Sequence, residues 1–151
     1  QADLIRKRLM SVRMRLYAAP GYLERAGTPG NVDDMRAHRL ICQAPGGVQV
    51  SAGAQLVQWL LTHDIPSRLT VNNYFGVLQG TINGLGIGVL PDYIVENAPE
   101  LVRVLPEVES NEVPVFLAYP EELRQSRRIA AFRDFVIEEI QAHRRKLGPA
   151  A

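Results

Sequence analysis

The sequence predicts an α/β fold with a mostly parallel sheet, because stretches with strand patterns alternate along the chain with stretches of helical spacing. Two segments carry most of this prediction. Residues 71–91 contain an asparagine-capped helix followed by a short apolar run that Pro91 ends. Residues 126–146 begin at Ser126, a good N-cap, and repeat apolar residues along one helical face.

The other elements follow from local signals for strands and for helix ends. Basic and apolar residues alternate before Pro20-Gly21, which is typical of a strand that stops at a turn. Asn31 is a good N-cap, with Asp33 and Asp34 in the first turn, where the helix dipole favours negative charge. In chain order we expect a strand over 4–16, helices over 22–26 and 32–38, a strand over 40–42, an irregular crossing over 44–53, strands over 56–62 and 68–71, a helix over 74–85, and strands over 87–90, 101–105 and 113–119.

Composition and charge restrict the classes of function. The chain has 151 residues, of which 46% are hydrophobic and 22% charged, as in a globular domain. Its net charge of +1 gives no general attraction to nucleic acid. The basic groups Arg6-Lys7-Arg8 and Arg144-Arg145-Lys146 are therefore interpreted as solvated faces. No apolar run has the length of a membrane helix, no signal peptide precedes the first charges, and we expect a cytoplasmic protein without membrane contact.

Side chains that could perform chemistry are few and scattered. His38, His63 and His143 have no metal-ligand spacing with Cys42, which we interpret as a buried apolar residue. The acidic pairs Asp33-Asp34, Glu121-Glu122 and Glu138-Glu139 are each adjacent in sequence and fall at helix starts or on solvated faces. We therefore expect no enzyme activity, no catalytic residue, no cofactor and no metal site.

The glycines at positions 84, 86 and 88 superficially resemble a nucleotide-binding loop. A dinucleotide fingerprint follows a strand and opens a helix, whereas these glycines follow a helix and open a strand. We interpret them as a helix cap followed by close backbone packing.

The corner formed by Asn72, Asn73, Tyr74 and Phe75 is the strongest candidate for a binding site. Ligands of open α/β sheets bind where strands end and helix N-termini begin, and free N–H groups at that point favour an anion. Helix capping needs only one of the two asparagines. Capping alone and ligand binding both remain open at this point.

Several motifs together resemble the effector-binding domain of LysR-type transcriptional regulators. They are Leu16-Tyr-Ala-Ala-Pro20-Gly-Tyr-Leu23, Asp33-Asp-Met-Arg-Ala-His38-Arg-Leu-Ile-Cys42, Leu69-Thr-Val-Asn-Asn73, Gly80-Thr-Ile-Asn-Gly84-Leu-Gly-Ile-Gly-Val-Leu-Pro91, Leu101-Val-Arg-Val-Leu-Pro106, residues 113–120 and Ser126-Arg-Arg-Ile-Ala-Ala-Phe132-Arg-Asp-Phe135. No single motif is specific, but their order and spacing cover nearly the whole chain.

The resemblance implies a fold like that of type 2 periplasmic binding proteins, with two α/β subdomains joined by crossing strands. It assigns residues 1–28 to the end of the first subdomain and the first crossover, 29–119 to the second subdomain, and 120–151 to the return to the first. The first subdomain would be incomplete. Because this would leave apolar sheet surface uncovered, we expect self-association, or that the missing residues are present but disordered.

The resemblance also implies a function and a set of ligand positions. A small effector, often an anion or aromatic acid, would bind between the subdomains at Ala19, Pro20, Asn72, Tyr74 and Pro91. Promoter DNA would be contacted only through an N-terminal winged helix-turn-helix that this sequence lacks, within a homodimer or homotetramer. The alternatives are a solute-binding protein of a transporter with the same fold, and an enzyme on a similar scaffold.

Overall fold

The structure, a computed structural model, describes residues 3–44, 52–65 and 67–147. Contacts within the chain divide it into two compact units. Unit 1 comprises Gln1–Ser11 and Pro114–Ala151, and unit 2 comprises Val12–Val113. Residues 12–28 belong to the segment 1–28 that the resemblance assigns to the end of the first subdomain and the first crossover, and they lie in unit 2. The assignment of the two units to sensing subdomains stays a prediction.

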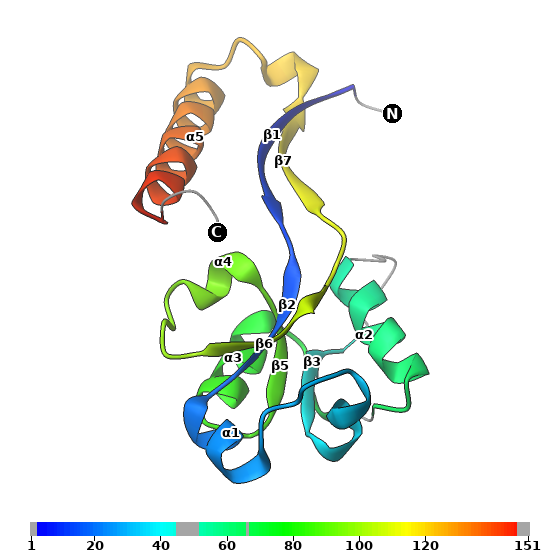
Figure 1. The fold of residues 1–151 in the computed structure, drawn as a ribbon. Helices are drawn as coiled ribbons and strands as arrows, with labels where there is room; N and C mark the ends of the chain where they lie inside the picture. Colours follow the sequence, from blue (N-terminus) through cyan, green and yellow to red (C-terminus); the bar gives the residue numbers. More distant parts are fainter. Residues whose placement is uncertain (1–2, 45–51, 66, 148–151) are drawn as a thin grey trace. The chain divides into compact units, whose positions relative to one another are not determined.

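Unit 2 is built on a five-stranded mixed sheet (Figure 1). The central strand β5 (Ile87–Pro91) pairs in parallel with β3 (Leu40–Gln43), and β3 pairs in parallel with β4 (Ser67–Val71). On its other side β5 pairs antiparallel with β2 (Met14–Ala18), which in turn pairs antiparallel with β6 (Val102–Glu109). The expectation of a mostly parallel sheet is therefore met on one side of β5 only.

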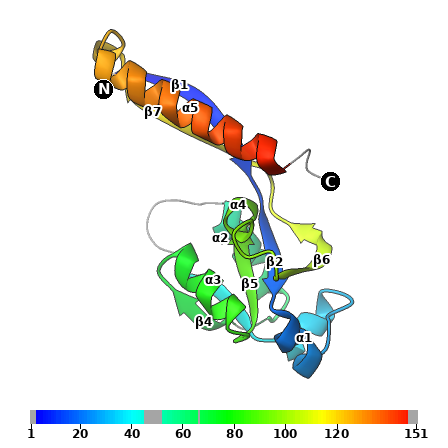
Figure 2. The same cartoon turned by 90° about the vertical axis from the view of Figure 1, so that its left-hand side faces the viewer.

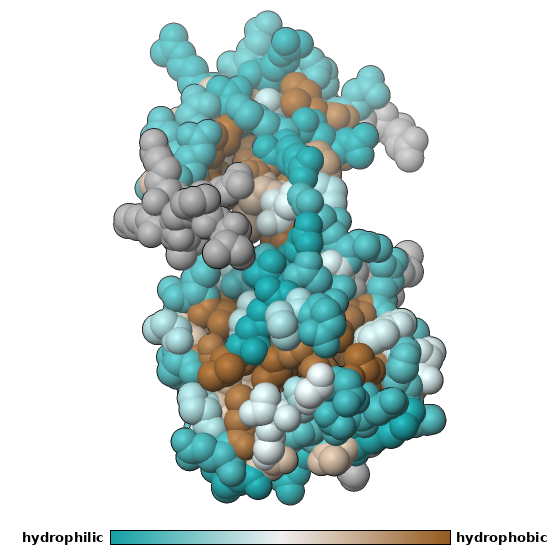
Figure 3. Space-filling model, viewed as in Figure 1, coloured by the Kyte–Doolittle hydropathy of each residue, from teal (hydrophilic) through white to brown (hydrophobic). Residues whose placement is uncertain are grey.

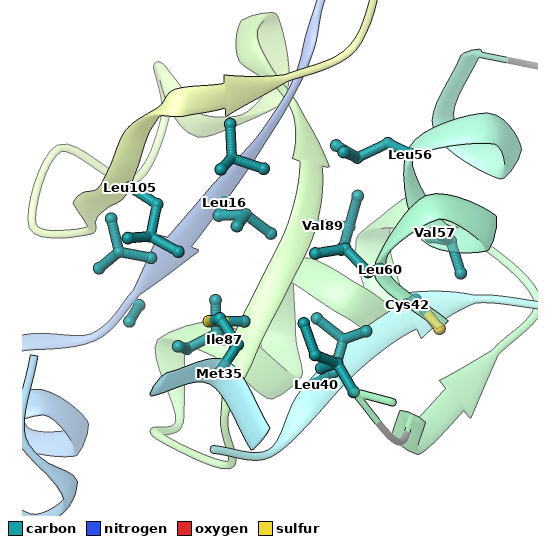
Figure 4. Close-up of a cluster of buried hydrophobic side chains, with 14 of the residues drawn as sticks. Leu16, Met35, Leu40, Cys42, Leu56, Val57, Leu60, Ile87, Val89 and Leu105 are labelled. Atoms are coloured by element: carbon teal, nitrogen blue, oxygen red, sulfur yellow. The ribbon is translucent and has the colours of Figure 1, made fainter. Parts of the chain in front are cut away.

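Two helices cover opposite faces of this sheet (Figures 1 and 2). From α2 (Ala52–Thr62), the side chains of Leu56, Val57 and Leu60 join one hydrophobic cluster together with Leu16 and Val89 (Figure 4). The helix α3 (Tyr74–Ile82) contributes Val77 and Leu78 to a second cluster, which also contains Tyr17 of β2. Alternate residues of β2 thus face different helices, as expected for a strand buried on both faces.

Short helices fill the connections of the chain. They are α1 (Pro20–Ala26), the 3-10 helices at Asp33–Ala37 and Glu121–Leu123, and α4 (Asp92–Val95). The helix expected over 32–38 is this first 3-10 turn, and Asn31 Oδ1 accepts a hydrogen bond from Asp34 N at 3.1 Å. The sequence patterns did not predict α4, whose single turn is too short to give a periodic signal.

The strand expected over Leu56–Thr62 is wrong, because these residues lie in α2. Leu56, Val57 and Leu60 are buried, and their spacing of one and four residues defines a helical face. Trp59 and Leu61 are also apolar, which gives the run the appearance of a strand, although both side chains are partly exposed. Most of the irregular crossing expected over 44–53 lies outside the described residues.

The glycines after α3 have the structural roles that were expected. Gly84 has a φ of 67°, in the left-handed region that ends many helices. Gly86 and Gly88 permit close packing, since a Cβ would lie 2.3 Å from Arg39 O at the first position and 2.1 Å from Thr81 Oγ1 at the second. The helix α3, the strand β5 and the backbone at Arg39 can therefore come this close to one another only because Gly86 and Gly88 lack a side chain.

Unit 1 consists of a two-stranded sheet and a long helix. The strands are β1 (Leu4–Val12) and β7 (Val113–Pro120), and the helix is α5 (Arg127–Leu147). Ser126 Oγ accepts from Ile129 N at 3.5 Å, which fits the predicted cap. The predicted apolar stripe of α5 is incompletely buried, with Phe132 and Phe135 56% and 58% exposed. Figure 3 shows hydrophobic residues at the surface of this unit.

Replacing Gly86 with alanine should destabilise unit 2 by about 1–3 kcal/mol, because the new methyl group would meet the Arg39 carbonyl. Gly21→Ala is the matched control, since Gly21 lies in α1 and its nearest neighbour is a flexible arginine side chain at 3.6 Å. Urea unfolding followed by circular dichroism measures both. Equal stabilities of the two variants would contradict the close-packing interpretation.

Unit 1 should drive self-association of the chain through its exposed apolar side chains, because a surface of this kind is rarely left in water. We expect the mass measured by light scattering to rise with protein concentration in the micromolar range. The double substitution Phe132→Ser/Phe135→Ser should shift the chain towards monomer, whereas Tyr93→Ser in unit 2, also at an exposed aromatic residue, should not. A wild-type chain that stays monomeric would contradict the expectation.

Candidate functional site

Strand direction brings several of the predicted site residues to one edge of the sheet in unit 2. The parallel strands β3, β4 and β5 end at Gln43, Val71 and Pro91, so the residues that follow them lie at the same edge. Asn72 and Asn73 connect the end of β4 to the start of α3. We call this place the carboxyl-edge site and define it by Gln43, Asn72, Asn73, Tyr74 and Pro91.

The two asparagines have different roles at this edge. Asn73 is the N-cap of α3, and its Oδ1 accepts a hydrogen bond from Gly76 N at 2.8 Å. Its Nδ2 donates to Asn72 Oδ1 at 2.7 Å, so the capping residue also orients its neighbour. Gln43 Nε2 donates to the carbonyl oxygen of Asn72 at 3.2 Å. Asn72 is exposed, and among the described residues its side-chain nitrogen Nδ2 has no acceptor, so it can donate beside the N-terminus of α3.

The aromatic residues of the corner also differ from one another. Tyr74 is half-buried and packs against both hydrophobic clusters of unit 2. Phe75 is 71% exposed, in the first turn of α3. The first turn of any helix leaves backbone N–H groups without an intrahelical acceptor, and Asn73 Oδ1 accepts from that of Gly76. The edge therefore combines N–H groups, an amide donor and an exposed ring, which suits an anion with an aromatic part.

Pro91 lies at the same edge and is buried at the end of β5. The next residue, Asp92, joins this end to the start of β2, because Asp92 N donates to Arg13 O at 2.9 Å and Arg13 N donates to Asp92 Oδ1 at 3.3 Å. Sequence patterns singled out neither Gln43 nor Arg13. Gln43 could have been found from its position directly after the buried run Leu40-Ile41-Cys42.

Ala19 and Pro20 lie at the opposite edge of the sheet, which corrects the expectation that they contact the same ligand as Asn72. The antiparallel register pairs Met14 with Pro91 and Tyr17 with Gly88, so β2 runs away from the carboxyl edge. Ala19 is buried, and its carbonyl oxygen accepts from Tyr22 N and Leu23 N at the start of α1. Its role in unit 2 is to begin a helix.

A cluster of charges lies near the start of β2. The carboxylate of Glu109 forms ion pairs with Arg13, with Arg15 at 3.0 Å and with Arg103 at 2.9 Å. Burial tends to raise the pKa of Glu109, but hydrogen bonds from Arg13 and Arg15 outweigh it and hold the pKa below its usual value. Burial of Tyr17, whose hydroxyl is bonded to Arg15, raises the pKa of that phenol.

His38 and Cys42 both lie in the interior of unit 2. Tyr22 Oη accepts from Arg39 N at 3.0 Å and lies 3.1 Å from His38 Nδ1. Burial lowers the pKa of His38, which favours the neutral ring. Cys42 is 2% exposed, as expected for a buried apolar residue. Within residues 3–44, 52–65 and 67–147, no group of three or more histidine, cysteine or acidic residues could hold a metal ion.

Comparisons with known proteins show the family to which the chain belongs. Residues 1–141 match the model of the LysR substrate binding domain. The chain belongs to this family. It is 31% identical over 128 residues to the HTH-type transcriptional regulator YhjC of Escherichia coli, covering 79% of this chain and 42% of that protein. It is 26% identical over 145 residues to the HTH-type regulator CrgA of Neisseria meningitidis, covering 89% of this chain and 46% of CrgA.

Solved structures of the family support the fold. The regulatory domain of CrgA, described as a LysR-type transcriptional regulator, superposes with a TM-score of 0.74 at 25% identity and covers 91% of this chain and 69% of that domain. The regulatory domain of AphB from Vibrio vulnificus superposes with a TM-score of 0.67. This chain therefore has the fold of LysR regulatory domains, and it spans less than half the length of the curated relatives it matches. Among the helices that the structure describes, none has both the length and the apolarity to cross a bilayer.

Replacing Glu109 with glutamine should lower the stability of unit 2 at pH 7 by about 1 kcal/mol, because three guanidinium groups would lose their shared carboxylate. The folded-state pKa of Glu109 lies below its unfolded value, so its contribution is complete above the unfolded pKa and disappears as pH falls through the folded pKa. The difference between variant and wild type should therefore shrink below about pH 4.5. Thermal unfolding from pH 7 to 3 measures this, and a constant difference would contradict it.

Proposed function

We propose that unit 2 carries the effector-contacting surface of a LysR-type regulator and that the effector is a small anion, with an aromatic carboxylic acid as the best fit. The observation that carries this proposal is the N-terminus of α3, where Asn73 caps the helix and orients Asn72. A carboxylate at this edge would meet the Asn72 amide and first-turn N–H groups. Phe75, which is exposed in the same turn, would contact a ring.

The site of this proposal comprises Gln43, Asn72, Asn73, Tyr74, Phe75 and Pro91. Ala19 and Pro20 are left out because they lie at the other edge of the sheet. In the full-length protein, which we propose to be cytoplasmic and dimeric or tetrameric, effector binding would change promoter binding through an N-terminal winged helix-turn-helix. The protein would therefore act by binding alone, without a catalytic step.

A solute-binding protein of a transporter with the same fold is the second candidate. The two candidates differ in the full-length protein, because only a regulator shifts a promoter fragment in a gel. Absence of a promoter shift with the full-length protein, at low and high effector concentration, would favour the transporter candidate.

Asn72→Ala should weaken binding of small aromatic carboxylates at least about tenfold, because a hydrogen bond to a charged group contributes about 1.5–3 kcal/mol. A library of small acids, screened by thermal shift with the full-length protein, first identifies the acid that binds best. Its dissociation constant is then measured by calorimetry for wild type and variant, alongside its uncharged amide.

Asn97→Ala is the matched control, since Asn97 is also exposed and is not one of the residues that define the site. It should bind the acid like the wild type. Equal affinity of Asn72→Ala and wild type, or equal affinity for the acid and its amide, would reject the carboxyl-edge site.

A further inference from the structure

A groove on the α2 side of unit 2 shares no lining residue with the carboxyl-edge site. It has a volume of about 280 Å³. One wall is α2 and the other is the end of β6 with the residues that follow it. The side chains that matter for its chemistry are Gln55, Trp59, Glu107 and Asn111, above Leu56 and Val108.

The wall contributed by β6 is an irregular segment. Arg15 of β2 pairs with Glu109, but the next residue, Leu16, pairs with Val104, so residues 105–108 bulge out of the ladder. Leu105 has a φ of 47°, a left-handed conformation that is costly for leucine, and its side chain is buried in the core. Arg103 supports the bulge by donating to Pro106 O and to Glu109. The bulge therefore has a defined shape that places Glu107 at the groove.

The floor of the groove is apolar and partly aromatic. Leu56 and Val108 are buried in the same hydrophobic cluster. Trp59 lies beside them and is 41% exposed, although most tryptophans in folded domains are largely buried. His63 contacts this indole with a centroid separation of 4.3 Å. The indole thus remains partly open to solvent in a groove whose floor excludes water.

The charge that this groove presents is negative. Glu107 is exposed, and within the described residues it has no ion pair or hydrogen bond. Glu109 also lines the groove, but its carboxylate is paired with Arg13, Arg15 and Arg103, none of which is a lining residue. Glu107 is therefore the carboxylate of the groove that is left for a guest. A guest in the groove would therefore meet a carboxylate and an indole.

We propose that this groove binds a small organic cation, a primary ammonium or guanidinium group on a short alkyl chain. Glu107 would pair with the cation, the exposed indole of Trp59 would attract it through its π face, and Leu56 and Val108 would contact the alkyl chain. The side-chain amides of Gln55 and Asn111 offer acceptors for the remaining N–H groups. The small volume suits a ligand below the usual drug size. This site does not depend on the proposed anionic effector.

Trp59 makes the proposal directly measurable, because the chain contains a single tryptophan. Titration with pentylammonium should change the indole fluorescence in a saturable way, whereas pentanol and pentanoate should not at the same concentrations. Backbone amide shifts in ¹⁵N spectra should move at Gln55, Ser110 and Asn111 in the same titration. Equal responses to the three probes, or shifts only outside the groove, would overturn the proposal.

Glu107→Gln should weaken pentylammonium binding roughly fivefold, which is the scale of a partly exposed ion pair. Glu100→Gln makes the same change of charge at another exposed carboxylate that does not line the groove, and it should leave the affinity unchanged. Both variants retain Trp59 as the reporter, and circular dichroism verifies that they fold. An equal affinity of Glu107→Gln and wild type, or an equal loss in both variants, would reject the site.

Discussion

The arrangement of unit 2 depends on the double pairing of β5, which is buried at all five positions. It accepts a parallel neighbour on one side and an antiparallel neighbour on the other. Gly86 and Gly88 make this possible, since any side chain there would meet the backbone at Arg39 or the hydroxyl of Thr81. The strand order of the sheet is β4-β3-β5-β2-β6, with β5 at the centre. The pairings of β5 therefore determine which loops lie at the same edge and which residues can contact one ligand.

One consequence is a separation of polar groups according to edge and face. The carboxyl edge collects the ends of β3, β4 and β5, and so collects the start of α3 with its N–H groups. The face under α2 instead receives the bulge of β6 and the carboxylate of Glu107. The two proposed sites therefore favour ligands of opposite charge, and they share no residue.

Local patterns predicted the elements whose ends are set by short-range interactions. Asn73 caps α3, Gly84 ends it, and Ser126 precedes α5, all of which depend on neighbours within a few residues. The motif resemblance also predicted the family, because it used the order of many such signals. Asn72 and Pro91 lie at one edge, since Asn72 follows and Pro91 ends strands that run in the same direction, and their role as ligand positions stays a prediction.

Features that depend on non-local pairing were not predictable in this way. The direction of β2 follows from its partners β5 and β6, and nothing within Met14–Ala18 specifies it, so Ala19 was assigned to the wrong edge. The run Leu56–Thr62 is apolar enough for either element, and only the helical face buried against the sheet decides for α2. The sequence gives even less indication of the β6 bulge, because the bulge requires a left-handed backbone conformation at Leu105, which leucine disfavours.

Long-range contacts also join the two segments through which the chain enters and leaves unit 2. The chain enters this unit at Val12 and leaves it at Val113. Just inside these points, Ser110 N donates to Met14 O and Met14 N donates to Ser110 Oγ, both at 2.9 Å. The ion pairs of Arg13 with Glu109 and Glu112 join the same two segments. Because entry and exit are tied together, a shift of β2 against β5 would move both connections at once, which is the kind of mechanical coupling that the proposed effector binding would need.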